Sequence, residues 1–427
     1  MILNRKKAPA IKDATEYPLT LKPYQSFRLR NGIEVYAIEA GPQDVLQMEL
    51  VFDAGNTYED KNLVAASVNF LLKNGTRRQT AFEINEHFEY YGAYLNRNCY
   101  NEHSNLVLHC LSKHLPDLLP ELRELITESV FPQEELDTYR RNMLQRLAVN
   151  LKKSDFVASR LIDVSLFGED HPYGKYSSPE AYAALTREQL VDFYEKHYLR
   201  GRCRIFIAGR IPARIDALLD KYFGDLDLSG EPPAQPEFVI SPSAQRHSRV
   251  INDPESVQGA IRIASPFPTK HHPDFQKAQV LNTVFGGYFG SRLMSNIRED
   301  KGYTYGIHSY LQSYIREGVW MISTEAGKDV CEAAVKEVYV EMARLRAEPI
   351  GEEELRLVRN FLIGTLLGDM DGPFHLIGRW KNMILQGFDE SFFKRSIEII
   401  KTIGAGELQQ LAEVYLQPER FYELIVL

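Results

Sequence analysis

The sequence predicts an α+β fold made of two tandem homologous domains, each an antiparallel sheet covered by helices. Strand patterns with tight turns are interleaved with long amphipathic helices in both halves of the 427 residues, which is typical of this class. Motifs of the first half recur in the same order about 218 residues later, which indicates a duplication. A polar, proline-rich segment beginning at Ser229 separates the halves. We therefore expect domains at 1–228 and 246–427, joined by a stiff linker at 229–245.

The composition is that of an ordinary globular protein, with 44% hydrophobic and 25% charged residues. A formal net charge of −8 argues against nucleic acid as a partner, and no segment has the length and apolarity of a membrane span. The basic N-terminus is not followed by an apolar run of signal-peptide length. We therefore expect a cytoplasmic protein without a membrane partner, or a periplasmic one if a leader was removed.

The four cysteines are spaced in a way that matches no disulfide framework, redox pair or zinc ribbon. They are Cys99, Cys110, Cys203 and Cys331. Buried free thiols in a reducing compartment are the simplest interpretation.

Alternating apolar residues predict the strands of the first half, with Asn31-Gly32 as the hairpin turn between the first two. These strands are expected at 26–29, 33–38, 46–52, 93–98, 105–110 and 203–208. Apolar residues three and four apart predict the helices. The helices are expected at 61–73, 81–91, 114–128, 132–151 and 186–198. Asp60 or Asn62 would cap the first of these helices, and Asn74-Gly75 would end it.

The second half repeats landmarks of the first. Glu134-Glu135-Leu136 recurs as Glu353-Glu354-Leu355, and each run opens a long helix shortly after a proline. The strand at 204–207 recurs at 423–426, and each of the two follows a helix that ends in Tyr-Leu. Because the repeated motifs occur in the same order in both halves, duplication explains them better than chance does.

Several short runs carry a resemblance to a known family. In the first half they are Ala54-Gly55-Asn56-Thr57-Tyr58-Glu59, Lys73-Asn74-Gly75-Thr76, Gly92 with Asn96, and Glu102-His103-Ser104-Asn105. In the second half they are Phe285-Gly286-Gly287, Ser291-Arg292-Leu293, Ile297-Arg298-Glu299 and Gly302-Tyr303-Thr304-Tyr305. Their order resembles the pitrilysin/insulinase family of inverzincin peptidases, in its short two-domain, processing-peptidase-like form. The resemblance implies the metallohydrolase fold of that family, peptide substrates and paired subunits.

Active members of this family carry His-x-x-Glu-His on the helix that precedes the Gly-Thr pair. Two histidines four apart bind zinc there, and the glutamate is the general base. Counted back from the helix end, these positions fall on Ala66, Asn69 and Phe70, and no histidine occurs in residues 59–85. The third ligand of the family falls on Arg146, whose charge would repel a divalent cation. The resemblance therefore implies vacated zinc and base positions, and we expect no metal in this chain.

Other histidines offer weaker candidates for a metal site. The run Cys99-Tyr100-Asn101-Glu102-His103 imitates the inverzincin spacing, but residues four apart share a face on a helix and not on a strand or turn. His271 and His272 are interpreted as a solvated pair at a helix start, and His109 and His114 as structural.

Arg298 and Tyr305 match the substrate-binding arginine and tyrosine that the family carries seven residues apart in its second domain. A guanidinium can bind a carboxylate or carbonyl in two places, and a phenol can donate to a carbonyl oxygen that gains charge. Alternatively, Arg298 is a surface residue that pairs with Glu299 or Asp300, and Tyr305 is a core aromatic. Tyr303, one strand step away, could take the place of Tyr305.

Three functions remain open. The first is a non-catalytic, substrate-binding subunit whose partner, a paralogue with His-x-x-Glu-His, supplies the zinc. A peptide would then add as a strand to the edge formed by 93–98, as the resemblance implies. The second is a purely structural assembly subunit, like the degenerate core proteins of respiratory complexes in this family. The third is an active metalloendopeptidase with an unrecognised metal site, in which the chain pairs with itself.

Overall fold

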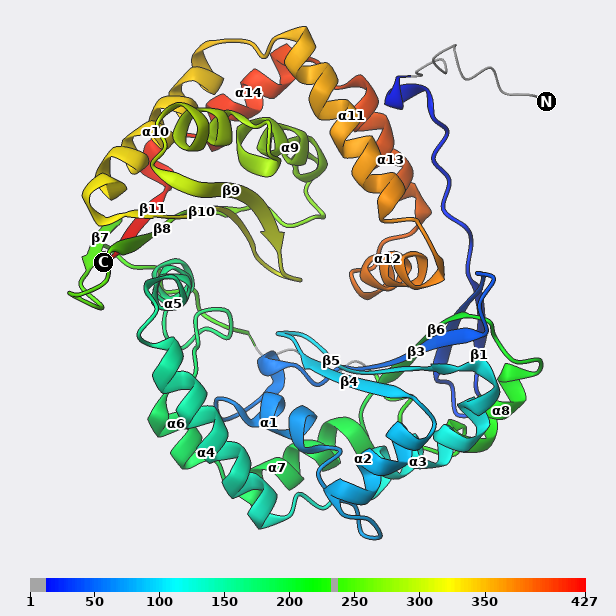
Figure 1. Ribbon diagram of the computed structural model, residues 1–427. Coiled ribbons are helices and arrows are strands. Elements are labelled where there is room, and N and C mark those ends of the chain that lie inside the picture. Colours follow the sequence, from blue (N-terminus) through cyan, green and yellow to red (C-terminus); the bar gives the residue numbers. More distant parts are fainter. Residues whose placement is uncertain (1–12, 232–236) are drawn as a thin grey trace.

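Each half of the chain contains one mixed β-sheet in the computed structural model, which describes residues 13–231 and 237–427 (Figure 1). The first sheet has the order β1-β2-β6-β3-β5-β4. Its strands are β1 (Gln25–Arg28), β2 (Glu34–Glu39), β3 (Val45–Phe52), β4 (Tyr94–Cys99), β5 (Ser104–Leu111) and β6 (Cys203–Gly209). The second sheet has the order β7-β11-β8-β10-β9. Its strands are β7 (His247–Val250), β8 (Gln258–Phe267), β9 (Thr304–Ser313), β10 (Gly318–Gly327) and β11 (Tyr422–Val426).

The two sheets share one topology once the extra strand β1 is set aside. The order β2-β6-β3-β5-β4 in the first sheet corresponds strand for strand to β7-β11-β8-β10-β9 in the second. The predicted α+β fold with two similar domains is confirmed.

The prediction of purely antiparallel sheets is wrong, because one pair of strands in each sheet is parallel. β6 runs parallel to β2, and β11 runs parallel to β7. In each half the last strand returns after a long helical excursion: β6 enters between β2 and β3, and β11 enters between β7 and β8. Such a crossover is long enough to allow parallel pairing, whereas the hairpins elsewhere enforce antiparallel pairing.

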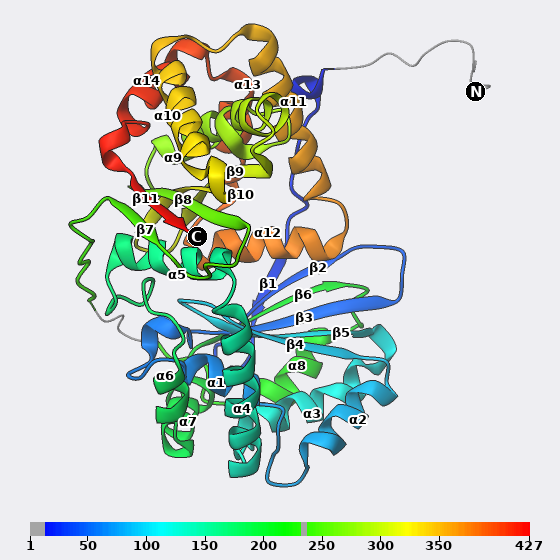
Figure 2. The ribbon, with the colours of Figure 1, turned by 60° about the vertical axis from the view of Figure 1, so that its left-hand side comes forward.

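Helices cover the outer face of each sheet, and the apolar side chains between the layers form the two main cores (Figures 1 and 2). The first half contains α1 (Val64–Leu71), α2 (Ala81–Tyr90), α3 (Leu115–Thr127), α4 (Gln133–Asn150), α5 (Ser154–Phe167), α6 (Pro179–Ala184), α7 (Arg187–Tyr194) and α8 (Ile215–Phe223). The second contains α9 (Asp274–Asn282), α10 (Cys331–Ala347), α11 (Glu352–Gly368), α12 (Pro373–Leu385), α13 (Glu390–Thr402) and α14 (Ala405–Tyr415). No helix in the described part of the chain is long and apolar enough to span a membrane.

Each half lends one helix to the sheet of the other half. Helix α5 of the first half packs on β8 and β11, where Ala158, Ile162 and Leu166 contribute to a third apolar cluster. Helix α12 of the second half packs on β2 and β6 (Figure 2). The sequence did not predict α5, because its partner is a distant sheet and not its own neighbours. The halves are therefore interlocked.

The linker predicted at 229–245 lies partly outside the described residues, which omit 232–236. On its far side the backbone N–H groups of Ser241 and Ser243 donate to carbonyls of Phe167 and Ser165, at 3.0 and 2.9 Å. This part of the linker thus follows the C-terminal end of α5.

The first helix is shorter than predicted, and the caps expected at its start are wrong. Neither Asp60 nor Asn62 caps α1; instead the carboxylate of Glu59 accepts from the backbone N–H groups of Leu63 and Ala65, at 3.2 and 2.9 Å. Leu63 has φ of 75°, which lets the chain turn back over Glu59 before α1 begins. The side chain of Glu59 is long enough to reach across this turn to the start of the helix. Asp60 and Asn62 have shorter side chains, lie within the turn and do not make this contact.

The cysteines are free, as predicted. Cys110, Cys203 and Cys331 are buried and Cys99 is half-buried.

Candidate functional site

Helix α1 sits beneath the sheet edge formed by β4, with its start held by Glu59. Burial raises the pKa of Glu59 to about 7, although the helix N–H groups that it accepts pull in the opposite direction. The positions predicted to correspond to zinc ligands and base lie on this helix. The contacts of the side chains at these positions indicate their function in the fold.

Asn69, at the predicted base position, is buried in the fold. Its amide nitrogen donates to the carbonyl oxygen of Asn105 at 3.2 Å and to the hydroxyl of Tyr198 at 3.3 Å. It therefore joins α1 to strand β5 and to the π-helix η4 (Glu195–Leu199). An amide engaged in this way is a structural link and has no proton-accepting function at neutral pH.

Phe70, at one predicted ligand position, packs against helix α4. Its ring centroid lies 4.9 Å from that of Tyr139, and the guanidinium of Arg97 lies 4.9 Å from the Phe70 centroid. Arg97 also donates to the backbone carbonyl of Phe70. One turn earlier, the hydroxyl of Ser67 donates to that of Tyr139 at 3.4 Å. Between Phe70 and α4 the space is thus filled by aromatic side chains.

Ala66 is half-buried on α1, and Arg146 is exposed on α4, about two helical turns beyond Tyr139. Burial is the main cause that raises the pKa of Tyr139 to about 12, and the nearby Arg146 lowers it slightly. Methyl, benzyl and guanidinium groups are not zinc ligands, so the residues present do not fit a zinc ion at these positions. Within 13–231 and 237–427, no three His, Cys, Asp or Glu side chains are grouped as a metal site requires.

Cys99 and His103 stand at the turn between β4 and β5, as predicted. The thiol of Cys99 lies 3.3 Å from the side-chain oxygen of Asn56, and burial raises its pKa to about 12. Burial also lowers the pKa of His103 to about 4, so the imidazole is neutral at physiological pH. A protonated thiol is a poor metal ligand. That this run holds no metal stays a prediction.

The remaining candidate histidines have local partners. His272 accepts from the N–H of Asp274 at 3.2 Å at the start of α9, and the His271 ring stacks on Phe388 at 4.4 Å. His109 lies 3.1 Å from the side-chain oxygen of Gln47 on the neighbouring strand. His271 and His272 are both exposed at this helix start, in agreement with the predicted solvated pair, and the contact of His109 agrees with its structural interpretation.

Arg298 and Tyr305 lie at the two ends of the short connection between the π-helix η6 (Met294–Asp300) and β9. The Arg298 guanidinium lies 4.4 Å from the ring centroid of Phe289, and its ion pair with Glu299 is long, at 4.0 Å. Tyr305 is 92% exposed. Tyr303 is half-buried, and its backbone N–H donates to the carbonyl of Ile297. The two tyrosines thus differ in exposure: Tyr305 is almost fully exposed, whereas Tyr303 is partly buried.

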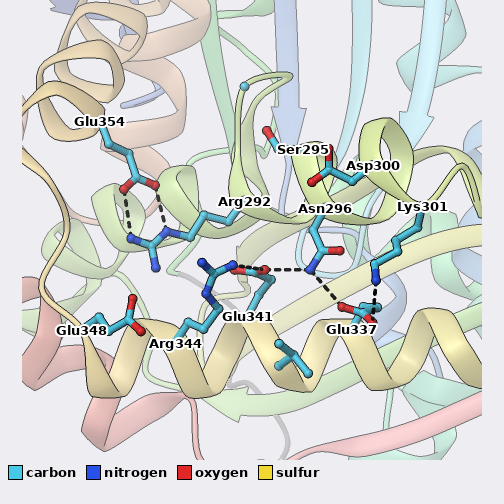
Figure 3. A pocket seen from close by; sticks show the side chains of 12 residues that line it. Arg292, Ser295, Asn296, Asp300, Lys301, Glu337, Glu341, Arg344, Glu348 and Glu354 are labelled. Atoms are coloured by element: carbon cyan, nitrogen blue, oxygen red, sulfur yellow. Dashed lines mark hydrogen bonds and ion pairs between the residues drawn. The ribbon is translucent and has the colours of Figure 1, made fainter.

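A polar network fixes η6 to the helices behind it (Figure 3). Arg292, just before η6, makes two hydrogen bonds of 2.9 Å to Glu354 of α11. The Asn296 amide donates to Glu337 at 3.0 Å and to Glu341 at 2.7 Å, both on α10. These residues line a cavity of about 600 Å³. The network holds the element that carries Arg298, and sequence reasoning missed it because its members are distant in the chain.

The edge strand β4 of the first sheet and the edge strand β9 of the second sheet differ in whether their outer backbone groups are covered. β4 is one of the two edge strands of the first sheet, and β1 is the other. β9 is the last strand of the second sheet, but its outer edge is covered: the Ile307 N–H lies 3.3 Å from the sulfur of Met294, and the Ser309 carbonyl accepts from Asn282 at 2.9 Å. Of these two edges, β4 is the one open to an added strand.

Two sequence models of one peptidase family match the chain. The model described as insulinase (peptidase family M16) matches residues 35–167, and the one described as the peptidase M16 inactive domain matches residues 184–362. Together they span well over half of the sequence.

Individual relatives agree with these matches. A protein named uncharacterized zinc protease from Rickettsia felis is 26% identical over 345 residues, which are 80% of this chain and 82% of that protein. Subunit 1 of the mitochondrial cytochrome b-c1 complex of Bos taurus is 26% identical over 269 residues, 62% of this chain and 55% of that protein. The crystal structure of a peptidase M16 inactive domain from Pseudomonas fluorescens shares the fold, with a TM-score of 0.84 at 23% identity over 94% of this chain and 98% of that one.

Proposed function

Because the chain belongs to the insulinase family of peptidases, family M16, we propose that it is a non-catalytic, substrate-binding subunit of a heteromeric zinc peptidase of that family. A paralogous partner with His-x-x-Glu-His would supply zinc and base, and this chain would lend Arg298 and Tyr305. The observation that carries the proposal is a contrast between two sites. Phe70 and Asn69 are committed to packing and hydrogen bonds, whereas Tyr305 is exposed without a packing function.

Arg298 and Tyr305 suit a peptide in complementary ways. The Arg298 guanidinium is held by a ring on one side and by one long ion pair, so its donors remain available to a peptide carboxylate or carbonyl. The exposed Tyr305 hydroxyl could donate to a scissile carbonyl oxygen as that oxygen gains negative charge. The open edge of β4 offers backbone groups to an extended peptide.

A purely structural assembly subunit is the second candidate, and the similarity to subunit 1 of the cytochrome b-c1 complex favours it. In that case Arg298 and Tyr305 have no catalytic importance. An active metalloendopeptidase is the third candidate, which the names of the zinc-protease relatives support. It requires tight zinc binding by this chain alone.

The test is to co-purify the chain with an M16 subunit from the same genome that carries His-x-x-Glu-His, and to measure kcat/KM on a fluorogenic peptide. Arg298→Ala and Tyr305→Phe should each lower kcat/KM by about tenfold to a thousandfold, the range for a lost charge-stabilising contact. Tyr303→Phe is the matched control and should stay within about twofold, because Tyr303 packs on the core.

Other outcomes separate the alternatives. Full activity of both variants would support a structural function. Stoichiometric zinc in the isolated chain, with peptide cleavage that Cys99→Ser or His103→Ala abolishes, would support the enzyme.

A further inference from the structure

A second cavity, of about 670 Å³, opens between β9, α9, α11, α12 and α13. In Figure 1 these elements surround the region between β9 and α12, on the side of the second half that faces the first half. One of its lining residues, Phe374 at the start of α12, touches His109 on β5 of the first sheet, with ring centroids 5.7 Å apart. The cavity is thus close to the junction of the halves and separate from the network behind Arg298.

Aromatic rings form much of its wall. Phe388 and Phe392 are stacked with centroids 4.2 Å apart, and Phe275, Phe374, Phe393 and Tyr310 complete the aromatic lining. Rings of this kind favour a flat or branched apolar group over a fully hydrated ligand.

Two cations, Arg379 and Lys270, and one carboxylate, Asp369, line the same cavity. Arg379 of α12 donates to Asp369 at 2.7 Å, and its buried Nε–H has no hydrogen-bond partner. Lys270, in the loop after β8, forms no ion pair among the residues that the structure describes. Burial, and secondarily the charge of Arg379, lower the pKa of Lys270, as expected for an ammonium with no counter-ion close by. The cavity therefore carries one uncompensated positive charge beside an apolar wall.

We propose that this cavity binds a carboxylate that is attached to an apolar, preferably aromatic, residue of a peptide. The carboxylate would pair with Lys270 on the cationic side of the cavity that Arg379 also lines, while the apolar group would contact Phe392 and Phe388. The carboxylate could come from a peptide C-terminus or from an acidic side chain next to an apolar one. The identification of the ligand as a peptide rests on the function proposed above, and it names a substrate feature that Arg298 and Tyr305 do not select.

Charge and shape argue against other anions. Phosphate groups are more strongly hydrated and carry no apolar body, so the rings would gain nothing from them. A nucleic acid would need a continuous basic surface, whereas the chain as a whole has a net charge of −8.

The test uses the full-length chain and N-acetyl-phenylalanine as the probe, with N-acetyl-phenylalaninamide as its uncharged analogue. Calorimetry or ligand-observed NMR should show the acid binding at least tenfold more tightly than the amide. Equal binding of acid and amide would overturn the proposal, and this comparison needs no variant.

Variants then locate the site. Lys270→Gln should remove most of the preference for the acid, and Lys394→Gln, at an exposed lysine of α13, should keep it. A preference that survives Lys270→Gln in a folded variant would also overturn the proposal.

Competition with peptides distinguishes the two sources of the carboxylate. Displacement of the probe by a Phe-ended free acid supports a C-terminal carboxylate, and displacement by an amidated Phe-Glu peptide supports a side chain. Displacement by neither contradicts the proposal. All these measurements use the chain without its partner, so their failure leaves the Arg298 and Tyr305 experiment unaffected, and the reverse also holds.

Discussion

Phe70 and Asn69, at the positions predicted to correspond to a zinc ligand and the general base, take part in packing and hydrogen bonding. Phe70 gains a ring contact with Tyr139 and a cation–π contact with Arg97, and Asn69 bridges helix and sheet. Each contact is worth on the order of 1 kcal/mol. These side chains therefore stabilise the fold locally.

Phe70→Ala tests this stabilising function. Because Phe70 is 39% exposed, its loss should cost about 1 to 2 kcal/mol, less than the loss of a fully buried phenylalanine. Urea unfolding followed by circular dichroism measures this difference. Phe82→Ala, at a 73% exposed site on α2, is the control and should change the free energy of unfolding by less than about 0.5 kcal/mol. Equal effects of the two changes would contradict the packing function of Phe70.

Glu59 makes the stability dependent on pH. Burial raises its pKa to about 7 in the folded chain, above the ordinary value of 4.5. Its contribution is therefore fully present below about pH 4.5 and is lost as the pH rises through 7. Glu59→Gln has no carboxyl group to ionise and therefore does not lose this stability. Between pH 4.5 and 7, the free energy of unfolding of the variant should rise relative to that of the natural chain, by on the order of 1 to 3 kcal/mol. A difference between the two proteins that is constant across this range would refute the assignment.

Helix α12 carries the contact that ties the second half to the first sheet. The amine of Lys381 lies 2.7 and 3.0 Å from the two carboxylate oxygens of Glu49 on β3, and the two side chains are only 15% and 3% exposed. Trp380 next to it donates to the carbonyl of Lys22 at 2.9 Å. A buried ion pair of this kind adds little net stability but is costly to break on one side.

Lys381→Met should therefore destabilise the chain by about 3 to 5 kcal/mol, because it leaves the buried charge of Glu49 without a counter-ion and with only the amide of Asn105 as a donor. The double variant Lys381→Met/Glu49→Gln should recover most of this loss, as measured by chemical denaturation. Lys394→Met, which breaks an exposed pair with Glu390, should cost less than about 0.5 kcal/mol. If the double variant is as unstable as the single one, the charge is not the cause.

At the scale of the whole molecule, the exchange of α5 and α12 makes one interlocked body of two similar halves (Figure 2). Ile162 and Leu166 of α5 are buried in a cluster with strands of the second sheet. Part of the apolar surface of each half is buried against the other half, which should hold the two together even without the chain connection.

A cut in the connection tests this arrangement. With a protease site in place of residues 232–236, the two fragments should co-elute from gel filtration after cleavage, because α5 and α12 remain buried. The same cleavage in an Ile162→Asp background should release them, since a carboxylate at this site would be buried without a partner. Separation of the fragments without that substitution would show that the helices contribute little to the association.

The sequence alone was sufficient for the α+β class, the duplication and the position of most strands, because these follow from local patterns with periods of two and 3.6 residues. The resemblance of its motifs also led us to predict Arg298 and Tyr305 as a substrate-binding pair, which stays a prediction. It did not distinguish Tyr305 from Tyr303, since exposure depends on what packs against β9 and not on the strand pattern.

Contacts between distant residues were decided only by the tertiary structure. The parallel placement of β6 and β11, the helices exchanged between halves and the network of Arg292 with Glu354 join residues far apart in the chain. No local pattern records them, because each depends on where separate elements meet. The cavity beside Lys270 is of the same kind: the sequence determined its charges and rings, and the packing of the helices around β9 brought them together.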